Sequence, residues 1–368
     1  MERPRGRPAS SSPEATARRG SGATGRAAPA PDPLARPTIK DVARESRVAA
    51  STVSRAFLHP GRVNPVTADR IFAVAEQLGY RPNPVARALP SGRTLMLALL
   101  VPDVTNPFYF HIIRGAERRA AAAGYTTVLA DTEESAEVEQ RHLERLVPMV
   151  DGVVFATSRM SDRSLAEHVS RRHMVLINRE AGSAPSVVLD TITGFKQAAE
   201  HLVSLGHRSL MYVAGPRSSW SDARRWRAVQ AAGRRLGVPV SRIGPFAPAV
   251  AGGAAAADAI VMAKATAVLA YNDLLAIGVL RRLVDRGLRV PADVSVVGCD
   301  NIFGSDLCQP ALTTLDSPAE EAGRVAVDLL LGALGAGGTA ARQHVLLPTH
   351  LLIRGSTGPV GTGRGAAR

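Results

Sequence analysis

The feature that most constrains the fold is an alternation of short apolar segments with helical segments between Leu95 and Ile353. Runs such as LMLALLV, GVVFA, MVLIN and VSVVG lack the polar alternation of a sheet that faces water on one side. Strands of this kind, separated by helices, predict parallel sheets covered on both faces. About ten such units exceed one sheet, so we expect two similar α/β lobes. A ligand would bind between them, beyond the carboxyl ends of the strands.

A smaller, all-helical domain is expected before this region, in residues 37–82. A T-x-x-D capping box at Thr38 predicts the start of a first helix. A second helix is expected over 50–58 and ends at an HPG breaker. Asn64, followed by proline, is typical of the start of a third helix. Three short helices would pack into one small bundle.

The two ends of the chain differ in composition from both domains. Residues 1–36 are rich in Arg, Pro, Ala and Ser without apolar periodicity, which predicts a disordered basic tail. The glycine-rich end predicts a second disordered tail over 356–368. No apolar run is long enough for a membrane span, and the first residues lack the apolar segment of a secretory signal. We therefore expect a cytoplasmic protein without membrane contact.

The positive charge of the chain is concentrated near its beginning. The net charge is +13, and residues 1–90 contain 15 Lys and Arg but only 7 Asp and Glu. A basic segment that includes a small helical domain is typical of a protein that binds nucleic acid. An arginine-rich composition throughout would be the alternative explanation, but it would not concentrate the charge at one end.

The second expected helix has the pattern of a recognition helix. In 38-TIKDVARESRVAASTVSRAF-57, small and basic side chains at Ala50, Ser51 and Arg55 cluster toward its N-terminal half. A recognition helix presents such residues to base edges in the major groove. Serine can donate or accept a hydrogen bond, alanine can contact a thymine methyl, and arginine can pair with guanine. Any small helical hairpin could imitate this pattern.

The complete set of motifs closely resembles the LacI/GalR family of transcription regulators. The resemblance spans about residues 37–355, with matches at TIKDVA, STVSRA, LGYRPN, VPDVTNPFY (101–109), VDGVVF (150–155), GLRVPADVSVVGCDN (287–301) and PALTTLDSP (310–318). It implies a homodimer that binds double-stranded operator DNA, a hinge over 83–92, and a periplasmic-binding-protein-like core over 93–355. Lobe one would comprise 93–189 and 317–342, and lobe two 190–316 and 343–355.

The resemblance also implies which residues contact DNA. They are Thr38, Ala50, Ser51, Thr52, Ser54 and Arg55 in the helical domain, and Asn83, Ala86, Arg87 and Leu89 in the hinge. Leu89 would wedge into the central base step, because apolar wedges in the minor groove unstack and kink DNA. A plain linker, with Leu89 packed on the core, is the alternative. Two departures are Arg47, where the family has Gly or Asn, and Ala49, where it has a capping Ser.

The effector residues implied by the resemblance lie around the expected cleft. They are Phe108, Tyr109, Asn178, Ser219, Trp220, Ser221, Arg225, Phe246, Asn272 and Asp300. Aromatic walls with a few planar hydrogen-bonding groups suit a neutral sugar better than a purine. Arg225 and Asp300 could instead form a structural ion pair, and Trp220 and Phe246 could be core aromatics.

The sequence gives less support to an enzyme or to a sugar-binding protein without a DNA role. No nucleophile elbow, HExxH, P-loop or strand-linked GxGxxG motif is present, which argues against an enzyme. The nine His and two Cys have no metal-ligand spacing, so we expect no metal and no cofactor. A sugar-binding protein without a DNA role would fit the core alone, but not the helix-turn-helix. The sequence therefore predicts a dimeric repressor controlled by a small metabolite, with a sugar as the expected class.

Overall fold

The computed structural model describes residues 37–81, 93–170, 173–335 and 343–360 of the chain. It divides into two compact units, one ending at Pro82 and the other starting at Asn83. The tail expected over 1–36 and the hinge expected over 83–92 lie outside the described residues. None of the described helices is long and apolar enough to cross a membrane.

The first unit is the small helical bundle that the sequence predicts. Its elements are α1 (Ile39–Glu45), α2 (Ala50–Leu58), the 3₁₀ turn η1 (Pro60–Arg62) and α3 (Pro65–Gln77). The capping box at Thr38 is confirmed, because its hydroxyl and amide both donate to the Asp41 carboxylate, at 2.7 and 2.9 Å. Val42, Val53 and Ile71, one from each helix, are fully buried and form the centre of the bundle.

The second unit contains two parallel sheets, as expected. The first sheet has six strands in the order β11-β5-β4-β3-β1-β2, and all its pairs are parallel. Its elements and those that cover it form lobe one: β1 (Met96–Val101), α5 (Phe108–Ala122), β2 (Thr126–Asp131), α6 (Ala136–Leu146), η2 (Val147–Met149), β3 (Gly152–Ala156), α7 (Asp162–Val169), β4 (Met174–Ile177), β5 (Ser186–Leu189), α12 (Ala319–Gly335) and β11 (His344–Leu347).

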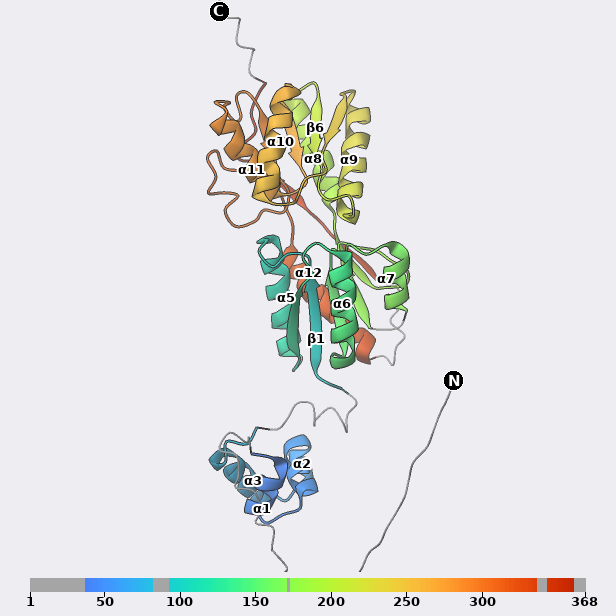
Figure 1. Ribbon diagram of the computed structural model, residues 1–368, viewed down its shortest axis with the longest axis vertical. Helices are drawn as coiled ribbons and strands as arrows, with labels where there is room; N and C mark the ends of the chain where they lie inside the picture. Colours follow the sequence, from blue (N-terminus) through green and yellow to red (C-terminus); the bar gives the residue numbers. More distant parts are fainter. Residues whose placement is uncertain (1–36, 82–92, 171–172, 336–342, 361–368) are drawn as a thin grey trace, which may run out of the picture. The chain divides into compact units, whose positions relative to one another are not determined.

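Helices cover both faces of this sheet (Figure 1). Along β1, Leu97 and Leu99 pack with α5 and α12, while Ala98 and Leu100 pack with α6 and α7. Helices α5 and α12 approach each other closely, and a Cβ at Gly115 would lie 1.9 Å from the backbone oxygen of Glu320. Burial of both sheet faces explains why the strand sequences are apolar without alternation.

Lobe two is built in the same way around a four-stranded parallel sheet, β7-β6-β8-β9. Helices α8 and α9 pack on one face through Leu210 and Tyr212 of β6, and α10 and α11 on the other through Met211 and Val213. The elements are α8 (Thr191–Ser204), β6 (Leu210–Val213), α9 (Trp220–Leu236), β7 (Val240–Ile243), α10 (Val250–Met262), β8 (Ala267–Ala270), α11 (Asp273–Asp285) and β9 (Ser295–Val297).

Two short strands pass between the lobes and correct the expected lobe boundaries. Strand β10 (Thr314–Asp316) pairs antiparallel with β12 (His350–Leu352). Strand β11 pairs with β5, so the part of 343–355 that contains it belongs to lobe one rather than lobe two. The sequence could not place this segment, because its short, half-exposed strands have little apolar pattern. Its place becomes clear only from its pairing in the sheet.

The first residues of the tail expected over 356–368 are packed on the core, while 361–368 lie outside the described residues. Ser356 is fully buried, and its hydroxyl donates to the backbone oxygen of Val296 at 2.6 Å. The amide of Gly358 donates to the hydroxyl of Ser295 at 3.1 Å. This segment therefore packs on lobe two. It is ordered despite its glycines, because polar groups of lobe two form hydrogen bonds with it.

Candidate functional site

Helix α2 presents a polar, accessible face in the first unit. Ser51 and Arg55 are exposed, and Ala50, Thr52 and Ser54 are half-buried, while Val53 and Ala56 face the core. Thr38, at the start of α1, is exposed as well. This division leaves the side chains expected to read DNA free to meet a groove, as a recognition helix requires.

Arg47 and Ala49, the two departures from the family pattern, stand at a left-handed turn residue and at a helix N-cap, as expected. Arg47 adopts a left-handed conformation with φ of 54°, which an arginine side chain disfavours. Ala49 is the N-cap of α2, and no side chain caps that end of the helix. The hinge residues Asn83, Ala86, Arg87 and Leu89 lie outside the described residues, so their role stays a prediction.

The second unit has a small cavity between its lobes, where the carboxyl ends of strands from both sheets meet. Its volume is about 20 Å³, enough for about one water molecule. A monosaccharide could enter only if the side chains or the lobes moved apart. The lining residues are Asn106, Phe108, Tyr109, Glu134, Thr157, Arg159, Asn178, Ser221, Arg225, Pro248, Tyr271, Asn272 and Asp300.

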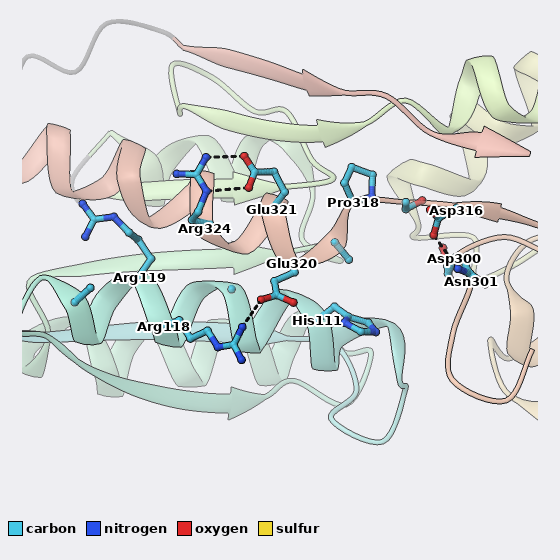
Figure 2. Close-up of a pocket in the computed structure, with 14 residues that line it drawn as sticks. His111, Arg118, Arg119, Asp300, Asn301, Asp316, Pro318, Glu320, Glu321 and Arg324 are labelled. Atoms are coloured by element: carbon cyan, nitrogen blue, oxygen red, sulfur yellow. Dashed lines mark hydrogen bonds and ion pairs between the residues drawn. The ribbon is translucent and has the colours of Figure 1, made fainter.

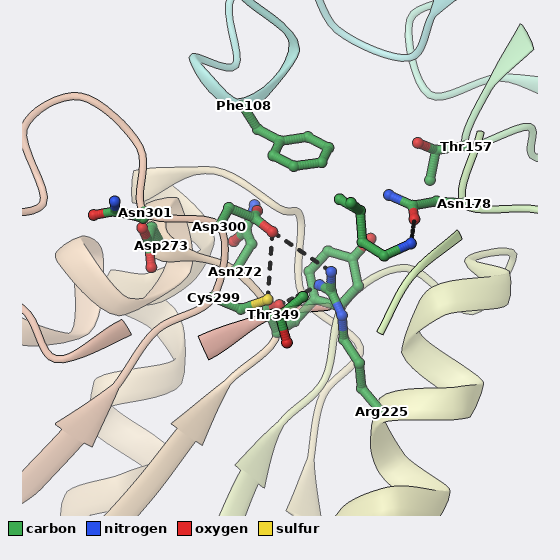
Figure 3. A network of polar contacts seen from close by, with 12 residues as sticks. Phe108, Thr157, Asn178, Arg225, Asn272, Asp273, Cys299, Asp300, Asn301 and Thr349 are labelled. Carbon is green, nitrogen blue, oxygen red and sulfur yellow. Dashed lines mark hydrogen bonds and ion pairs between the residues drawn. The ribbon is translucent and has the colours of Figure 1, made fainter. Parts of the chain in front are cut away.

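Arg225 and Asp300 form a buried pair on the lobe-two side of this cavity (Figure 3). The closest nitrogen and oxygen lie 3.5 Å apart, and the side chains are only 5% and 6% exposed. Arg225 also donates to the backbone oxygen of Tyr271 at 2.5 Å. Burial raises the pKa of Asp300 to about 7, although the Arg225 charge opposes this shift. The two residues that the sequence singled out are therefore in contact.

Other expected residues are fixed by hydrogen bonds at the edge of the cavity. The side-chain oxygen of Asn178 accepts from the amide of Leu189 at 3.0 Å. The side-chain oxygen of Asn272 accepts from the amide of Leu275 at 3.0 Å and caps α11. Phe108 and Tyr109, both buried, pack edge to face at the start of α5. Aromatic and amide groups of the two lobes thus converge on one place.

Three expected residues do not line this cavity. The hydroxyl of Ser219 caps α9 through the amide of Asp222 and contacts the hydroxyl of Tyr271. Trp220 stacks with Arg224, whose guanidinium carbon lies 4.4 Å from the ring centroid. Phe246 packs partly buried against the core of lobe two. Contact of Trp220 and Phe246 with a ligand would therefore need a different arrangement of the cleft.

The structure adds an ion pair on the lobe-one side that the sequence reading missed. Arg159, which follows β3, donates from Nε to the Glu134 carboxylate at 2.5 Å. Its side chain is only 2% exposed. Tyr271, which follows β8, lines the same cavity as Arg159 and Arg225. The rule that ligands bind beyond strand ends could have found these residues, because each comes shortly after an apolar run.

Strained backbone is concentrated at these strand ends. Among the non-glycine residues with positive φ, Glu133, Glu134, Thr157, Asn178 and Asp300 all follow strands at the cavity. Such conformations cost of order 1–3 kcal/mol each and are found disproportionately at ligand sites. The strain therefore supports the cavity as the place of function.

A larger hollow lies along α5 and α12 of lobe one and extends to Asp300 and Asn301 of lobe two (Figure 2). Its volume is about 720 Å³. Its charged side chains are paired with each other, as in Arg118 with Glu320 at 2.8 Å and Arg324 with Glu321. Because these charges are already satisfied at the surface, size alone does not make this hollow the effector site.

Comparison with known proteins identifies both units. The family described as bacterial regulatory proteins, lacI family, matches residues 38–83. A periplasmic binding protein-like domain matches residues 199–357. Both agree with the resemblance and the fold class expected from the sequence.

Individual relatives match over most of the chain. The transcriptional repressor CytR of Escherichia coli K12 is 33% identical over 334 residues, which is 87% of this chain and 96% of that protein. A solved lac repressor dimer, bound to operator and the anti-inducer ONPF, is 26% identical with a TM-score of 0.78, covering 88% of this chain and 100% of its own. The regulator CelR in complex with cellobiose is 29% identical with a TM-score of 0.65, covering 87% and 100%. These relatives are regulators rather than enzymes.

Proposed function

Because this chain belongs to the lacI family of bacterial regulatory proteins, we propose that it is a homodimeric transcription repressor controlled by a small metabolite. The strongest support is the combination, in one chain, of an exposed recognition-helix face with a two-lobed core whose cleft contains buried ionisable groups. Such a regulator acts in the cytoplasm, where its DNA lies.

Operator recognition would use the exposed face of α2. Arg55 has the reach and the paired donors to bind guanine, and Ser51 and Ala50 can contact neighbouring base edges. Thr38, Thr52 and Ser54 would bind the DNA backbone and set the position of the helix. In the hinge, Leu89 would enter the minor groove, with Asn83, Ala86 and Arg87 beside it.

The effector would bind in the cavity between the lobes. Phe108 and Tyr109 would contact its apolar face, and Arg225, Asn272, Asn178 and Asp300 its polar groups. A sugar is the class proposed, in line with the cellobiose complex of the related CelR. The effector controls operator binding only if it binds one arrangement of the lobes more tightly than another.

A second copy of the chain would cover exposed apolar side chains of the core. Phe110 on α5 is 46% exposed, and Phe303 and Leu307, in the loop after β9, are 77% and 69% exposed. Asn301 of this loop and His111 of α5 line the same surface hollow, so the loop lies near the start of α5 (Figure 2). An apolar surface of this kind is typical of an interface.

Footprinting on the DNA upstream of its own gene, with and without sugars, tests this function. We expect two protected half-sites, and an affinity that falls by orders of magnitude over a few-fold rise in salt. Arg225→Ala should weaken the response to effector roughly ten- to a hundredfold, because one charge-assisted hydrogen bond contributes about 1.5–3 kcal/mol. Arg227→Ala, exposed on the same helix, is the control. Absence of any specific footprint would contradict the proposal.

A further inference from the structure

Arg159 is a buried cation whose hydrogen-bonding capacity is not filled. Its Nε donates to Glu134, but Nη1 is buried and has no hydrogen-bond partner among the residues that the structure describes. The side chain lines the cavity and is only 2% exposed, so bulk solvent does not supply an acceptor for this nitrogen. A buried guanidinium with an unpaired N–H is costly, which makes such a group an indication of a missing partner.

The opposite wall shows the same shortage of acceptors. Within the described part of the chain, the Nε of Arg225 is also buried without a partner, although its other nitrogens contact Tyr271 and Asp300. The two carboxylates of the cavity, in contrast, already accept hydrogen bonds, Glu134 from Arg159 and Asp300 from the Cys299 thiol at 3.3 Å. The unpartnered groups that line this cavity are therefore guanidinium donors of Arg159 and Arg225.

The charges of the cavity favour an acceptor that is negative. Burial alone would lower the pKa of Arg159, but Tyr271 and Glu134 beside it raise this pKa above its ordinary value, so the guanidinium stays charged. Because burial raises the pKa of Asp300 to about 7, its negative charge is only partly present near neutral pH. The four ionisable groups then carry a net positive charge, which an anionic ligand would neutralise.

The chemistry of the ligand group follows from donors and acceptors. A hydroxyl can accept a hydrogen bond from a guanidinium, but it brings no negative charge to compensate the cation. A carboxylate or a phosphate only accepts, and can take two parallel bonds from one guanidinium. Glu134, held in a left-handed conformation with φ of 57°, fixes Arg159 from the far side.

We propose that the effector is a sugar-like polyol bearing a carboxylate or phosphate, and that Arg159 binds this anionic group. The proposal rests on the cleft being the effector site. It replaces the neutral sugar expected from Arg225 and Asp300 alone, because that expectation did not include Arg159.

Thermal unfolding of the full chain in inorganic phosphate, against chloride of equal ionic strength, tests the anion site without knowledge of the effector. We expect phosphate to raise the Tm of the wild type by more than that of Arg159→Gln. Arg163→Gln, exposed on α7, should respond like the wild type and controls for phosphate bound elsewhere. A phosphate response equal in Arg159→Gln and the wild type would overturn the proposal.

Calorimetry with matched pairs identifies the source of the anionic group. Ribose would be compared with ribose 5-phosphate, and glucose with glucuronate and glucose 6-phosphate. We expect the acidic member of a pair to bind at least about tenfold more tightly, and Arg159→Gln to remove this preference. Arg159→Lys should keep part of it and shows that the fold tolerates a change here. Equal binding of neutral and acidic members contradicts the anion site but not the regulator, whose failure would instead appear as absence of operator binding.

Discussion

At the scale of the residue, two buried carboxyl groups make the core sensitive to pH. Asp300 and Asp273 lie close together near the carboxyl end of β9, and burial raises their pKa values to about 7 and about 6. Asp273 is held by the hydroxyl of Thr314 and the amide of Ile302, at 2.6 and 2.9 Å, but these bonds do not outweigh its burial. Both groups bind a proton more tightly in the folded chain than in the unfolded one.

The sign of the pH dependence follows from this difference. A carboxyl group with a raised folded pKa stabilises the fold fully below its unfolded pKa and loses that contribution as pH rises through the folded value. For Asp300 the loss spans roughly pH 4 to pH 7. Asp300→Asn cannot titrate, so its free energy of unfolding should improve relative to the wild type as pH rises through this window.

Urea unfolding of both proteins at several pH values checks this expectation, with Asp306→Asn, exposed in the following loop, as the control. Parallel curves for Asp300→Asn and the wild type would mean that Asp300 titrates normally in the folded chain.

The residues of the cleft were predictable to different degrees. Arg225 and Asp300 were predicted because the family resemblance implies effector residues at these positions, and the structure brings them into contact. Arg159 and Glu134 stand in polar stretches that look like exposed loops. The burial of Arg159 and its pairing with Glu134 depend on strand ends that meet in space, which local sequence does not encode.

At the scale of the element, the missing cap of α2 offers a stabilising change. Ala49 is exposed at the N-cap with an extended backbone, the conformation in which a serine side chain accepts from the helix amides. Ala49→Ser should therefore stabilise the helical unit by about 0.5–2 kcal/mol. Chemical unfolding followed by a probe in that unit measures the gain. Thr38→Ala, which removes the hydroxyl of the existing capping box, should shift stability in the opposite direction; a loss in Ala49→Ser would contradict the capping argument.

The exposed face of α2 gives a second prediction at this scale. Arg55→Ala should lower operator affinity by roughly 1–3 kcal/mol and relax the preference at one symmetric pair of bases, if its guanidinium reads guanine. Binding to a library of operator variants measures both effects. Arg62→Ala, in the turn after α2, serves as a comparison for a basic residue outside the helix. A uniform loss over all variants in Arg55→Ala would assign this arginine to the DNA backbone.

Elements were predicted best where local chemistry alone determines them. The Thr38 capping box, the Asn64 cap and the fully apolar strands appear as expected, because each depends on neighbours in sequence or on burial of both faces. The sequence pattern did not predict strands β10, β11 and β12. They are three or four residues long, and their place depends on partners far along the chain, such as Ser186 for His344.

At the scale of the whole second unit, the chain passes between the lobes at three places. These are the segments after β5, after β10 and after β11. The hydroxyl of Thr349, in the third segment, donates to the backbone oxygen of Asp190, in the first, at 2.9 Å. The crossings thus contact each other, and a change of angle between the lobes would move them together. A ligand that touches Arg159 and Arg225 would bias this angle from both sides.

Dimerisation gives the last prediction, because a single recognition helix would read only half of a symmetric operator. Phe303→Asp places a charge on the apolar surface of the core, where Phe303 is 77% exposed and supports no interior packing. If a second copy covers this surface, the buried charge should weaken the dimer at least about tenfold. Sedimentation velocity would show the monomer.

Operator occupancy by Phe303→Asp should fall more steeply than that of the wild type when the protein is diluted. Two monomers must then assemble on the DNA to fill both half-sites. Effector binding to each core should persist, since Phe303 does not line the cavity. Met262→Asp, at an 84% exposed position at the end of α10, is the matched control. If Phe303→Asp stays as dimeric as Met262→Asp, the two copies meet through another surface, and the exposed Phe110 on α5 is the next position to change.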